Sequence, residues 1–221
     1  MNWHPPRPES LTIEGPSGAL EAMLEDPRFS VAPAAGVGFA VVCHPHPLYG
    51  GTMQNKVVHA VARACQQYGM PSLRFNFRGV GASVGSYDGG RGEIDDALAV
   101  IAFGRQRWPD APLTLAGFSF GAMIALSAAV SSMPSRLITI APAVGRPEFS
   151  AVTGPACPWL IVQGDADELV DVRDVRAFAA RFRPAPKLVV LEGVEHFFHG
   201  RLTELRERVL SFLRDEETRQ S

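Results

Sequence analysis

The sequence is poor in cysteine, with only three in 221 residues, each within an apolar run. An odd and sparse set of thiols does not build the disulfide framework of small secreted domains. We therefore expect Cys43, Cys65 and Cys157 to be small buried thiols. The chain also lacks an excess of charge of one sign, since 21 Lys and Arg face 23 Asp and Glu. A nearly neutral chain without a basic cluster offers no electrostatic surface for nucleic acid.

Signals for membranes and export are also missing. No apolar run reaches the length of about 20 residues that a membrane-spanning helix needs. The N-terminal stretch MNWHPPRPES has no basic segment followed by an apolar one, so it does not resemble a secretory signal. We expect a cytoplasmic protein with no membrane partner and a loose proline-rich arm over residues 1–8. The sequence carries no signal for an oligomeric state.

The chain does contain short apolar runs that alternate with longer segments of helical spacing. Strands are predicted at 37–43, 72–77, 112–117, 136–142, 158–164 and 187–193, after a hairpin around 15–18. Helices are predicted at 56–68, 93–105, 119–130, near 172–182 and after 202. This order predicts the α/β class, with a mostly parallel twisted sheet and helices on both faces. One domain over 1–221 is expected, without a lid, because residues 143–157 are too few for helical lid elements.

A candidate nucleophile lies where a strand meets a helix, in Gly117-Phe118-Ser119-Phe120-Gly121. This G-x-S-x-G pattern in that context is typical of a nucleophile elbow. The sharp turn needs close backbone approach at both glycines, and it lifts the Ser119 hydroxyl out at the carboxyl edge of the sheet. The alternative interpretation is a serine that caps a helix beside two packing glycines.

A serine nucleophile needs a base, and the base needs an acid to orient it. His196 follows the last predicted strand and leaves the same sheet edge as Ser119, whereas His199 lies further along and is expected at the surface. The acids available after the preceding strand are Asp165, Asp167, Glu168 and Asp171. The order Ser, Asp, His on loops after successive strands is the one expected for this architecture.

The motifs GFSFG, GDADELV and VEHFFHG together resemble the α/β-hydrolase superfamily. With HPHPLYGGTMQNKVV and NFRGVGASVG, the chain is similar to small lidless bacterial hydrolases related to dienelactone hydrolase, over roughly residues 10–215. In that family the acid stands three residues after the glycine that ends the strand. The resemblance therefore implies Ser119 as nucleophile, Asp167 as acid and His196 as base. Asp165 and Asp171 remain possible if the loop is arranged differently.

The stretch His44-Pro45-His46-Pro47 follows the third predicted strand. Acyl transfer by a serine needs two N–H donors for the oxyanion, one after the nucleophile and one from this loop. Phe120 would supply the first. Prolines have no N–H, so His46 would supply the second from a stiff loop.

Two other motifs suggest cofactors, and both are set aside. The spacings His44-x-His46 and His196-x-x-His199 could suggest a metal, but Pro45 stiffens the loop and no cysteine or carboxylate pattern completes a ligand set. The glycines at 79–81 faintly resemble a dinucleotide loop, but no helix begins there, so a glycine-rich turn pinned by Arg78 is predicted. We expect no metal and no cofactor.

These observations predict a serine hydrolase acting on a small-molecule acyl substrate, an ester or a thioester, through an acyl-enzyme. Without a lid the site should be open and shallow, with apolar walls from Tyr49, Phe118, Phe197 and Phe198. Two alternatives remain. One is a binding or regulatory protein on a hydrolase scaffold, since fold does not determine function. The other is an acyltransferase, peptidase or depolymerase that uses the same triad.

Overall fold

The computed structural model describes residues 8–27, 37–149 and 151–220. Most of the predicted N-terminal arm therefore lies outside the described residues. The strands are β1 (Glu9–Gly15), β2 (Gly18–Glu25), β3 (Phe39–Cys43), β4 (Ser72–Phe75), β5 (Leu113–Phe118), β6 (Arg136–Ile140), β7 (Trp159–Gly164) and β8 (Lys187–Leu191). The helices are α1 (Lys56–Tyr68), α2 (Arg91–Arg107), α3 (Phe120–Ser132), α4 (Val172–Ala179) and α5 (Leu202–Gln220).

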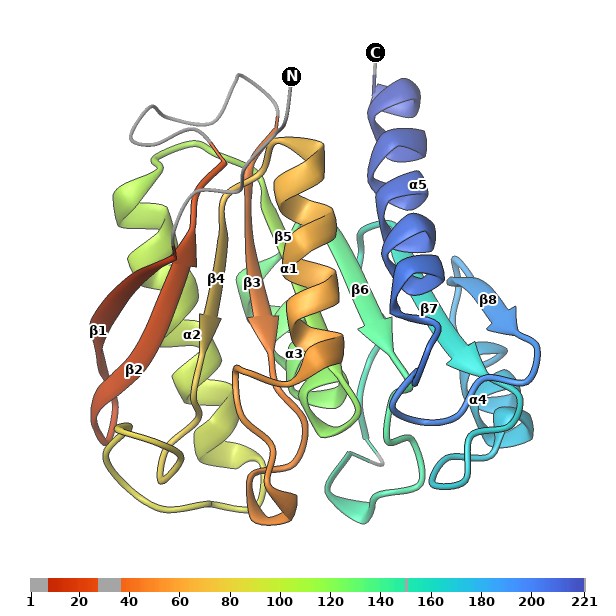
Figure 1. Ribbon diagram of the computed structural model, residues 1–221, viewed down its shortest axis with the longest axis horizontal. Coiled ribbons are helices and arrows are strands. Elements are labelled where there is room, and N and C mark those ends of the chain that lie inside the picture. The colour runs from red at the N-terminus through yellow and green to blue at the C-terminus, as the bar shows by residue number, and fades with distance from the viewer. Residues whose placement is uncertain (1–7, 28–36, 150, 221) are drawn as a thin grey trace.

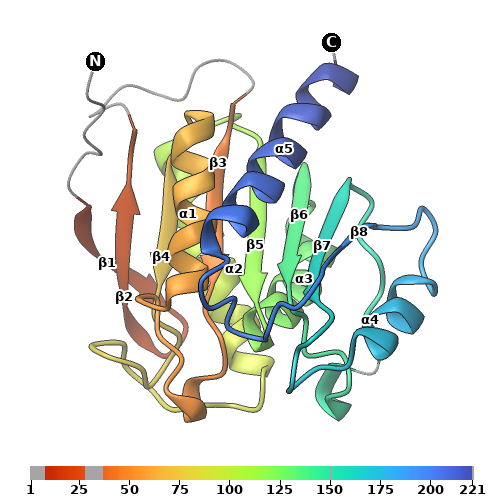
Figure 2. The ribbon, with the colours of Figure 1, turned by 45° about the vertical axis from the view of Figure 1, so that its right-hand side comes forward.

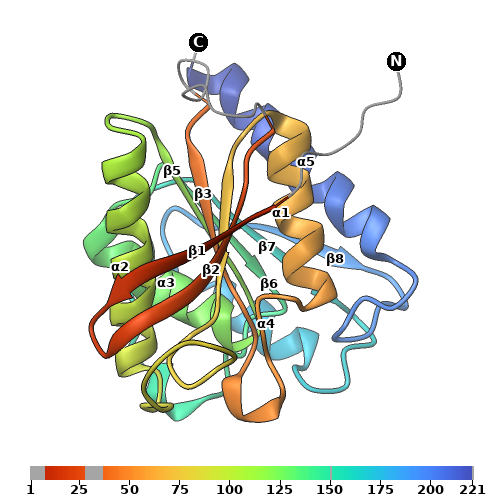
Figure 3. The ribbon, with the colours of Figure 1, turned by 60° about the vertical axis from the view of Figure 1, so that its left-hand side comes forward.

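Within the described residues the eight strands form one sheet in the order β1-β2-β4-β3-β5-β6-β7-β8. The hairpin β1–β2 pairs antiparallel with β4 at one edge, and the six other strands run parallel. Helices α1 and α5 cover one face, and α2, α3 and α4 cover the other (Figures 1 and 3). The predicted fold class is confirmed. Between β6 and β7, the described residues form only a short turn, Pro147–Phe149.

The central strand β3 shows why the sheet is covered twice. All five of its residues are buried. Phe39 and Val41 pack in the core under α2 and α3, whereas Ala40 and Val42 pack in the core under α1 and α5. Successive side chains of a strand point to opposite faces, so a continuous apolar run requires two covering layers.

Helix α1 has the predicted bounds because both ends carry a local signal. The side chain of Asn55 accepts a hydrogen bond from the Val57 N–H at 2.9 Å and caps the start. Gly69 ends the helix with φ 88°, a left-handed conformation that glycine adopts at low cost. This placement directs the start of α1 toward the loop after β3.

The three cysteines and the described helices can be compared with the expectation of a cytoplasmic protein. Cys43 and Cys65 are buried and Cys157 is half-buried, and none of the three forms a disulfide. Burial raises the pKa of Cys65 to about 12 and that of Cys157 to about 11, so both stay protonated. Among the described helices, none combines the length and apolarity needed to cross a bilayer. A cytoplasmic location stays a prediction.

Candidate active site

Ser119 stands at the turn between β5 and α3. Its backbone has φ 55° and ψ −116°, a strained conformation for a residue with a side chain. The Ser119 N–H donates to the carbonyl of Ile140 on neighbouring β6 at 2.9 Å. The turn therefore holds the serine at the carboxyl edge of the sheet, where the loops after the parallel strands gather (Figures 1 and 2).

The two glycines of the turn are required by close backbone packing. A Cβ atom at position 117 would lie 2.1 Å from the carbonyl oxygen of Gly121. A Cβ atom at position 121 would lie 2.3 Å from the carbonyl oxygen of His44. Real Cβ atoms do not approach backbone that closely, so α3 can pack against the loop after β3 only without these side chains.

Two short contacts connect three of the predicted site residues. The Ser119 Oγ lies 3.0 Å from Nε2 of His196, and Nδ1 of His196 lies 2.8 Å from Oδ2 of Asp167. An ionised carboxylate only accepts, so Nδ1 carries the proton and Nε2 is left to accept the serine hydroxyl. The side chains of His196 and Asp167 are 2% and 0% exposed, which shields both contacts from water.

The Asp167 carboxylate is fully hydrogen-bonded. Its Oδ1 accepts the N–H groups of Leu169 at 2.9 Å and Val170 at 2.8 Å. Its Oδ2 accepts from Nε2 of Gln163 at 2.8 Å in addition to His196. Burial alone would raise the pKa of Asp167, but the hydrogen bond and charge of His196, with the two backbone donors, hold it below its usual value.

The other acids of this loop have different partners. Asp165 accepts the Gly193 N–H at 2.7 Å, and Asp171 caps α4 and pairs with Arg173. Glu168 accepts the backbone N–H of His196 at 3.1 Å and so holds the histidine loop rather than its ring. Of the four candidate acids, Asp167 is the one that the structure brings to the imidazole.

His44 explains the stiffness of the loop after β3. Its Nδ1–H donates to the carbonyl of Pro45 at 2.6 Å, and its Nε2 accepts the N–H of Phe77 at 3.0 Å. Burial lowers the pKa of His44 to about 4, which keeps the ring neutral and able to accept. Both ring nitrogens are thus in use within the protein. Among the described residues no three His, Cys, Asp or Glu side chains gather as a metal site.

The two predicted oxyanion donors lie on adjoining elements. Phe120 is the first residue of α3, where a backbone N–H has no partner within the helix. The His46 ring packs 4.7 Å from the Phe120 ring, and its Nδ1 accepts the Leu48 N–H at 3.2 Å. The role of either N–H stays a prediction at this point.

A cavity of about 660 Å³ opens above Ser119, with residues from the loops after β3, β5, β6, β7 and β8 in its wall. Tyr49 and Phe197 line it as predicted and are 81% and 39% exposed. The prediction for Phe118 and Phe198 is wrong, because both are fully buried and neither lines the cavity. Phe118 instead packs 5.0 Å from the His196 ring, on the side of the core.

The structure also adds residues that the sequence does not identify. Val144, Arg146 and Leu169 line the cavity from loops whose course no local pattern predicts. One feature of the sequence could have indicated the contact from Gln163 to Asp167, namely a polar residue inside the apolar strand WLIVQG.

The glycine turn after β4 is a structural turn, as predicted. The Val80 N–H donates to the Phe77 carbonyl at 3.1 Å. Arg78 makes a bidentate ion pair with Asp96 of α2, with its Nη2 at 2.8 Å from Oδ1. This pair pins the turn to α2.

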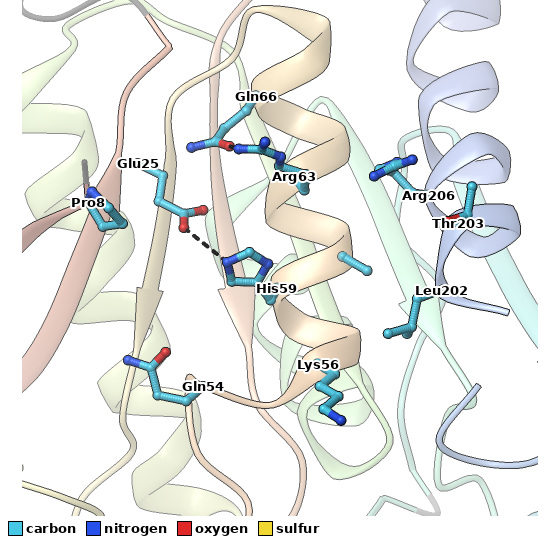
Figure 4. Close-up of a pocket in the computed structure, with 11 residues that line it drawn as sticks. Pro8, Glu25, Gln54, Lys56, His59, Arg63, Gln66, Leu202, Thr203 and Arg206 are labelled. Carbon is cyan, nitrogen blue, oxygen red and sulfur yellow. Dashed lines mark hydrogen bonds and ion pairs between the residues drawn. The ribbon is translucent and has the colours of Figure 1, made fainter. Parts of the chain in front are cut away.

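A second cavity, of about 610 Å³, lies between α1 and α5. Figure 4 shows Arg63 of α1 and Arg206 of α5 on its two sides, with Glu25 directed toward His59. Glu25 is buried and already paired with Arg74 at 2.8 Å. None of the described hydrogen bonds joins a nucleophile to a base there. The two cavities have similar volumes but differ in chemistry. Among the described residues, a hydroxyl in contact with an imidazole lies in the cavity at Ser119 and not in the second one.

Comparison with known proteins gives matches along most of the chain. The hydrolase family model described as serine aminopeptidase, S33 matches residues 41–156, more than half of the chain. The crystal structure of XC6422 from Xanthomonas campestris, a member of the a/b serine hydrolases without lid, is 43% identical, with a TM-score of 0.88 over 97% of each chain. An alpha-beta serine hydrolase homologue from Coxiella burnetii is 45% identical, with a TM-score of 0.86 over 92% of this chain and 96% of that one. The uncharacterized protein RP471 of Rickettsia prowazekii is 34% identical over 92% of this chain and 87% of its own length.

Proposed function

The chain belongs to the α/β-hydrolase superfamily, and on that premise we propose that it cleaves a small carboxylic ester or thioester through an acyl-enzyme. The observation that carries the proposal is the pair of contacts from Asp167 to His196 and from His196 to Ser119, at 2.8 and 3.0 Å. An imidazole oriented by a buried carboxylate, within hydrogen-bond distance of a hydroxyl, is the arrangement that activates a serine. The narrower likeness to dienelactone hydrolase stays a prediction.

The reaction follows from these contacts. The Ser119 Oγ attacks the substrate carbonyl carbon while its proton passes to Nε2 of His196. The tetrahedral intermediate then breaks its bond to the leaving oxygen or sulfur, which takes the proton back from Nε2. Water then loses a proton to the same nitrogen and attacks the acyl carbon. The bond from that carbon to Ser119 Oγ breaks, Oγ takes the proton back from Nε2, and the acid is released. Asp167 stabilises the imidazolium in both half-reactions.

The oxyanion would be held by the backbone N–H groups of His46 and Phe120. The position of Phe120 at the start of α3 supports this assignment, since the helix dipole favours negative charge there. The ring contact between the two residues and the closed turn from His46 to Gly51 keep the loop close to α3. Removal of one such donor in serine hydrolases typically lowers kcat by about 10²–10³-fold.

Labelling with a fluorophosphonate probe tests the activated serine directly. We expect the wild type to be labelled, Ser119→Ala to be unlabelled and His196→Ala to react much more slowly. Ser127→Ala is the matched control, because Ser127 lies on the same helix and its hydroxyl only donates to the Met123 carbonyl. A folded wild type that does not react would contradict the proposal and favour a binding or regulatory protein on this scaffold.

A panel of p-nitrophenyl esters and acyl thioesters then tests the substrate class. The cavity has no lid among the described residues, so we expect turnover of short acyl groups and declining kcat/KM for long ones. Labelling without turnover of any ester or thioester would leave the activated serine in place but overturn this substrate class.

A peptidase is the second candidate, because the matching family model is described as serine aminopeptidase. Asp174 lines the cavity, next to the Asp171–Arg173 ion pair, and its carboxylate could attract the ammonium group of a peptide. Turnover of aminoacyl p-nitroanilides faster than that of the matching esters would favour the peptidase. The same panel run with added alcohols or amines detects transfer of the acyl group to an acceptor other than water.

A further inference from the structure

A buried glutamine lies inside the apolar strand β7. Gln163 has no exposed surface, and every other residue of the strand except Gly164 is apolar. A buried amide without hydrogen bonds is strongly unfavourable, so its partners indicate what the side chain does in this strand.

The amide nitrogen faces three acceptors. Nε2 of Gln163 lies 2.8 Å from Oδ2 of Asp167, 3.1 Å from the Val170 carbonyl and 3.2 Å from the Gly164 carbonyl. Acceptors on all three sides require the NH₂ group there, so the orientation of the amide is unambiguous. The other end, Oε1, is buried without a partner among the described residues. An apolar side chain of equal length would avoid that penalty, so the contribution of the amide lies in its N–H groups.

The oxygen that Gln163 contacts is the one that faces His196. Oδ2 of Asp167 therefore receives two donors at 2.8 Å from different directions, while Oδ1 receives two backbone N–H groups. With two donors on each oxygen, the orientation of the Asp167 carboxylate is fixed. Resting on the function proposed above, we propose that Gln163 is a positioning residue of the triad, which holds Oδ2 of Asp167 against Nδ1 of His196.

The position of Gln163 suits this role. It lies at the carboxyl end of β7, one residue before Gly164, and a Cβ atom at Gly164 would lie 2.0 Å from the Val194 carbonyl of the histidine loop. The titratable groups in contact with Asp167 or its histidine are the His196 ring and Glu168, which accepts the His196 N–H. Asp165, Asp171, Arg173 and Asp174 line the same depression as Asp167, and Asp171 and Arg173 pair with each other. Gln163 is thus a neutral donor that belongs to the sheet itself.

Two substitutions give opposite pH signatures. Gln163→Met keeps the length and removes the donor. We expect the rate of fluorophosphonate labelling to fall roughly tenfold at pH 7, as for a lost hydrogen bond to a charged group. The acid limb of its pH profile should move to higher pH, because Asp167 then holds its proton more tightly.

Gln163→Glu keeps the shape and donates only while its carboxyl is protonated. At low pH we expect labelling near the wild-type rate. As pH rises, two adjacent carboxylates repel, so the rate should fall on the alkaline side, where the wild type shows no such fall. A merely structural glutamine would lose labelling only where the variant also unfolds, so a fall in rate at a pH where the Tm of Gln163→Glu is unchanged supports the positioning role.

Thr139→Val is the matched control, because Thr139 is a buried polar residue of adjacent β6 whose hydroxyl accepts from the Trp159 indole rather than from the triad. Its labelling rate and pH profile should match those of the wild type even if its Tm falls. If both Gln163 variants fold and label with wild-type rates and profiles, the positioning role is wrong while the proposed function stands. If Gln163→Met does not fold, Gln163→Glu alone decides. If the wild type itself does not label, the proposed function fails first.

Discussion

Ser119 adopts a backbone conformation that residues with side chains seldom take, with φ 55°. The surrounding hydrogen bonds hold it there. Its N–H donates to Ile140, and its carbonyl accepts from Ala122 at 3.1 Å and from Ala143 at 3.3 Å. Strain of this kind persists only where neighbouring structure enforces it. At the scale of single residues, the site therefore depends on close backbone packing as much as on the three polar side chains.

Gly121→Ala tests that packing. The added methyl would meet the carbonyls of His44 and Cys43 at 2.3 and 2.5 Å. We expect the free energy of unfolding to fall by about 2 kcal/mol or more, with labelling of Ser119 reduced in parallel. Urea unfolding measures the first effect. Gly145→Ala is the control, because Gly145 lines the cavity and a Cβ atom there meets nothing within 4 Å. Equal stability of both variants would contradict the close approach at Gly121.

Asp167→Asn tests the choice among the acids. The amide keeps the shape but turns an N–H toward Nδ1 of His196, which favours the wrong tautomer, so we expect labelling to slow by about 10³–10⁴-fold. Asp165→Asn should label within about twofold of the wild type, because Asp165 bonds only the Gly193 N–H. A larger loss in Asp165→Asn than in Asp167→Asn would reassign the acid.

At the scale of elements, the loop after β4 depends on α2. Arg78 is 8% exposed and Asp96 is fully buried, and their side chains share a bidentate contact. The Asp96 carboxylate also accepts the Arg78 backbone N–H at 2.9 Å. The side-chain hydrogen bond between the guanidinium and Asp96 raises the pKa of Arg78, so the guanidinium stays charged. One aspartate on a helix thereby fixes the backbone of a loop 18 residues earlier.

Asp96→Asn should lower the free energy of unfolding by about 3 kcal/mol, because it leaves a buried guanidinium without its counter-charge. The double variant Arg78→Met, Asp96→Leu should recover much of the loss. Asp215→Asn breaks the exposed pair with Lys187 and should cost less than about 1 kcal/mol. Urea unfolding of the four proteins gives the comparison, and similar losses for the buried and the exposed pair would contradict it.

The sequence predicts the helices and strands better than it predicts which way side chains point and what they contact. The bounds of α1 follow from Asn55 and Gly69, whose capping roles are local. Strand β4 ends at Phe75, two residues before the predicted end, because the Asn76 side chain accepts the Met53 N–H and donates to Glu21. Such tertiary partners are not visible in a local pattern.

The candidate site shows the same division. The order of motifs and the family resemblance lead to Ser119, Asp167 and His196, which the structure brings into contact. The error at Phe118 has a physical reason. Phe118 is next to Ser119 in sequence but still belongs to strand β5, and its side chain points into the core shared with α1 and α5.

At the scale of the whole molecule, acid sensitivity is built into the buried loop that faces the site. His44 has a pKa of about 4 when folded, mainly through burial, against an ordinary value of 6.5. In the unfolded chain His44 therefore binds a proton below pH 6.5, whereas in the folded chain it stays unprotonated down to about pH 4. The contribution of neutral His44 to the free energy of unfolding is fully present above pH 6.5, and it is lost as pH falls toward 4.

We expect protonation of His44 to lower the free energy of unfolding by about 3 kcal/mol as the pH falls from 6.5 to 4. His44→Gln should be less stable than the wild type at pH 7, yet the difference between the two should shrink toward pH 4. Urea unfolding at half-unit steps measures both curves. Carboxylates are common to the two proteins and cancel in the difference, so a constant difference over the range would show that His44 does not titrate as described.

The 77-residue separation between Ser119 and His196 has a consequence for synthesis and folding. Ser119 emerges from the ribosome well before His196. On the proposed function, its hydroxyl meets its base only when β7 and β8 have joined the sheet. The reactivity of Ser119 toward a covalent probe would then report when the fold is complete. Pulse labelling during refolding would time the docking of the last strands, and truncated chains ending before residue 196 would stay silent throughout.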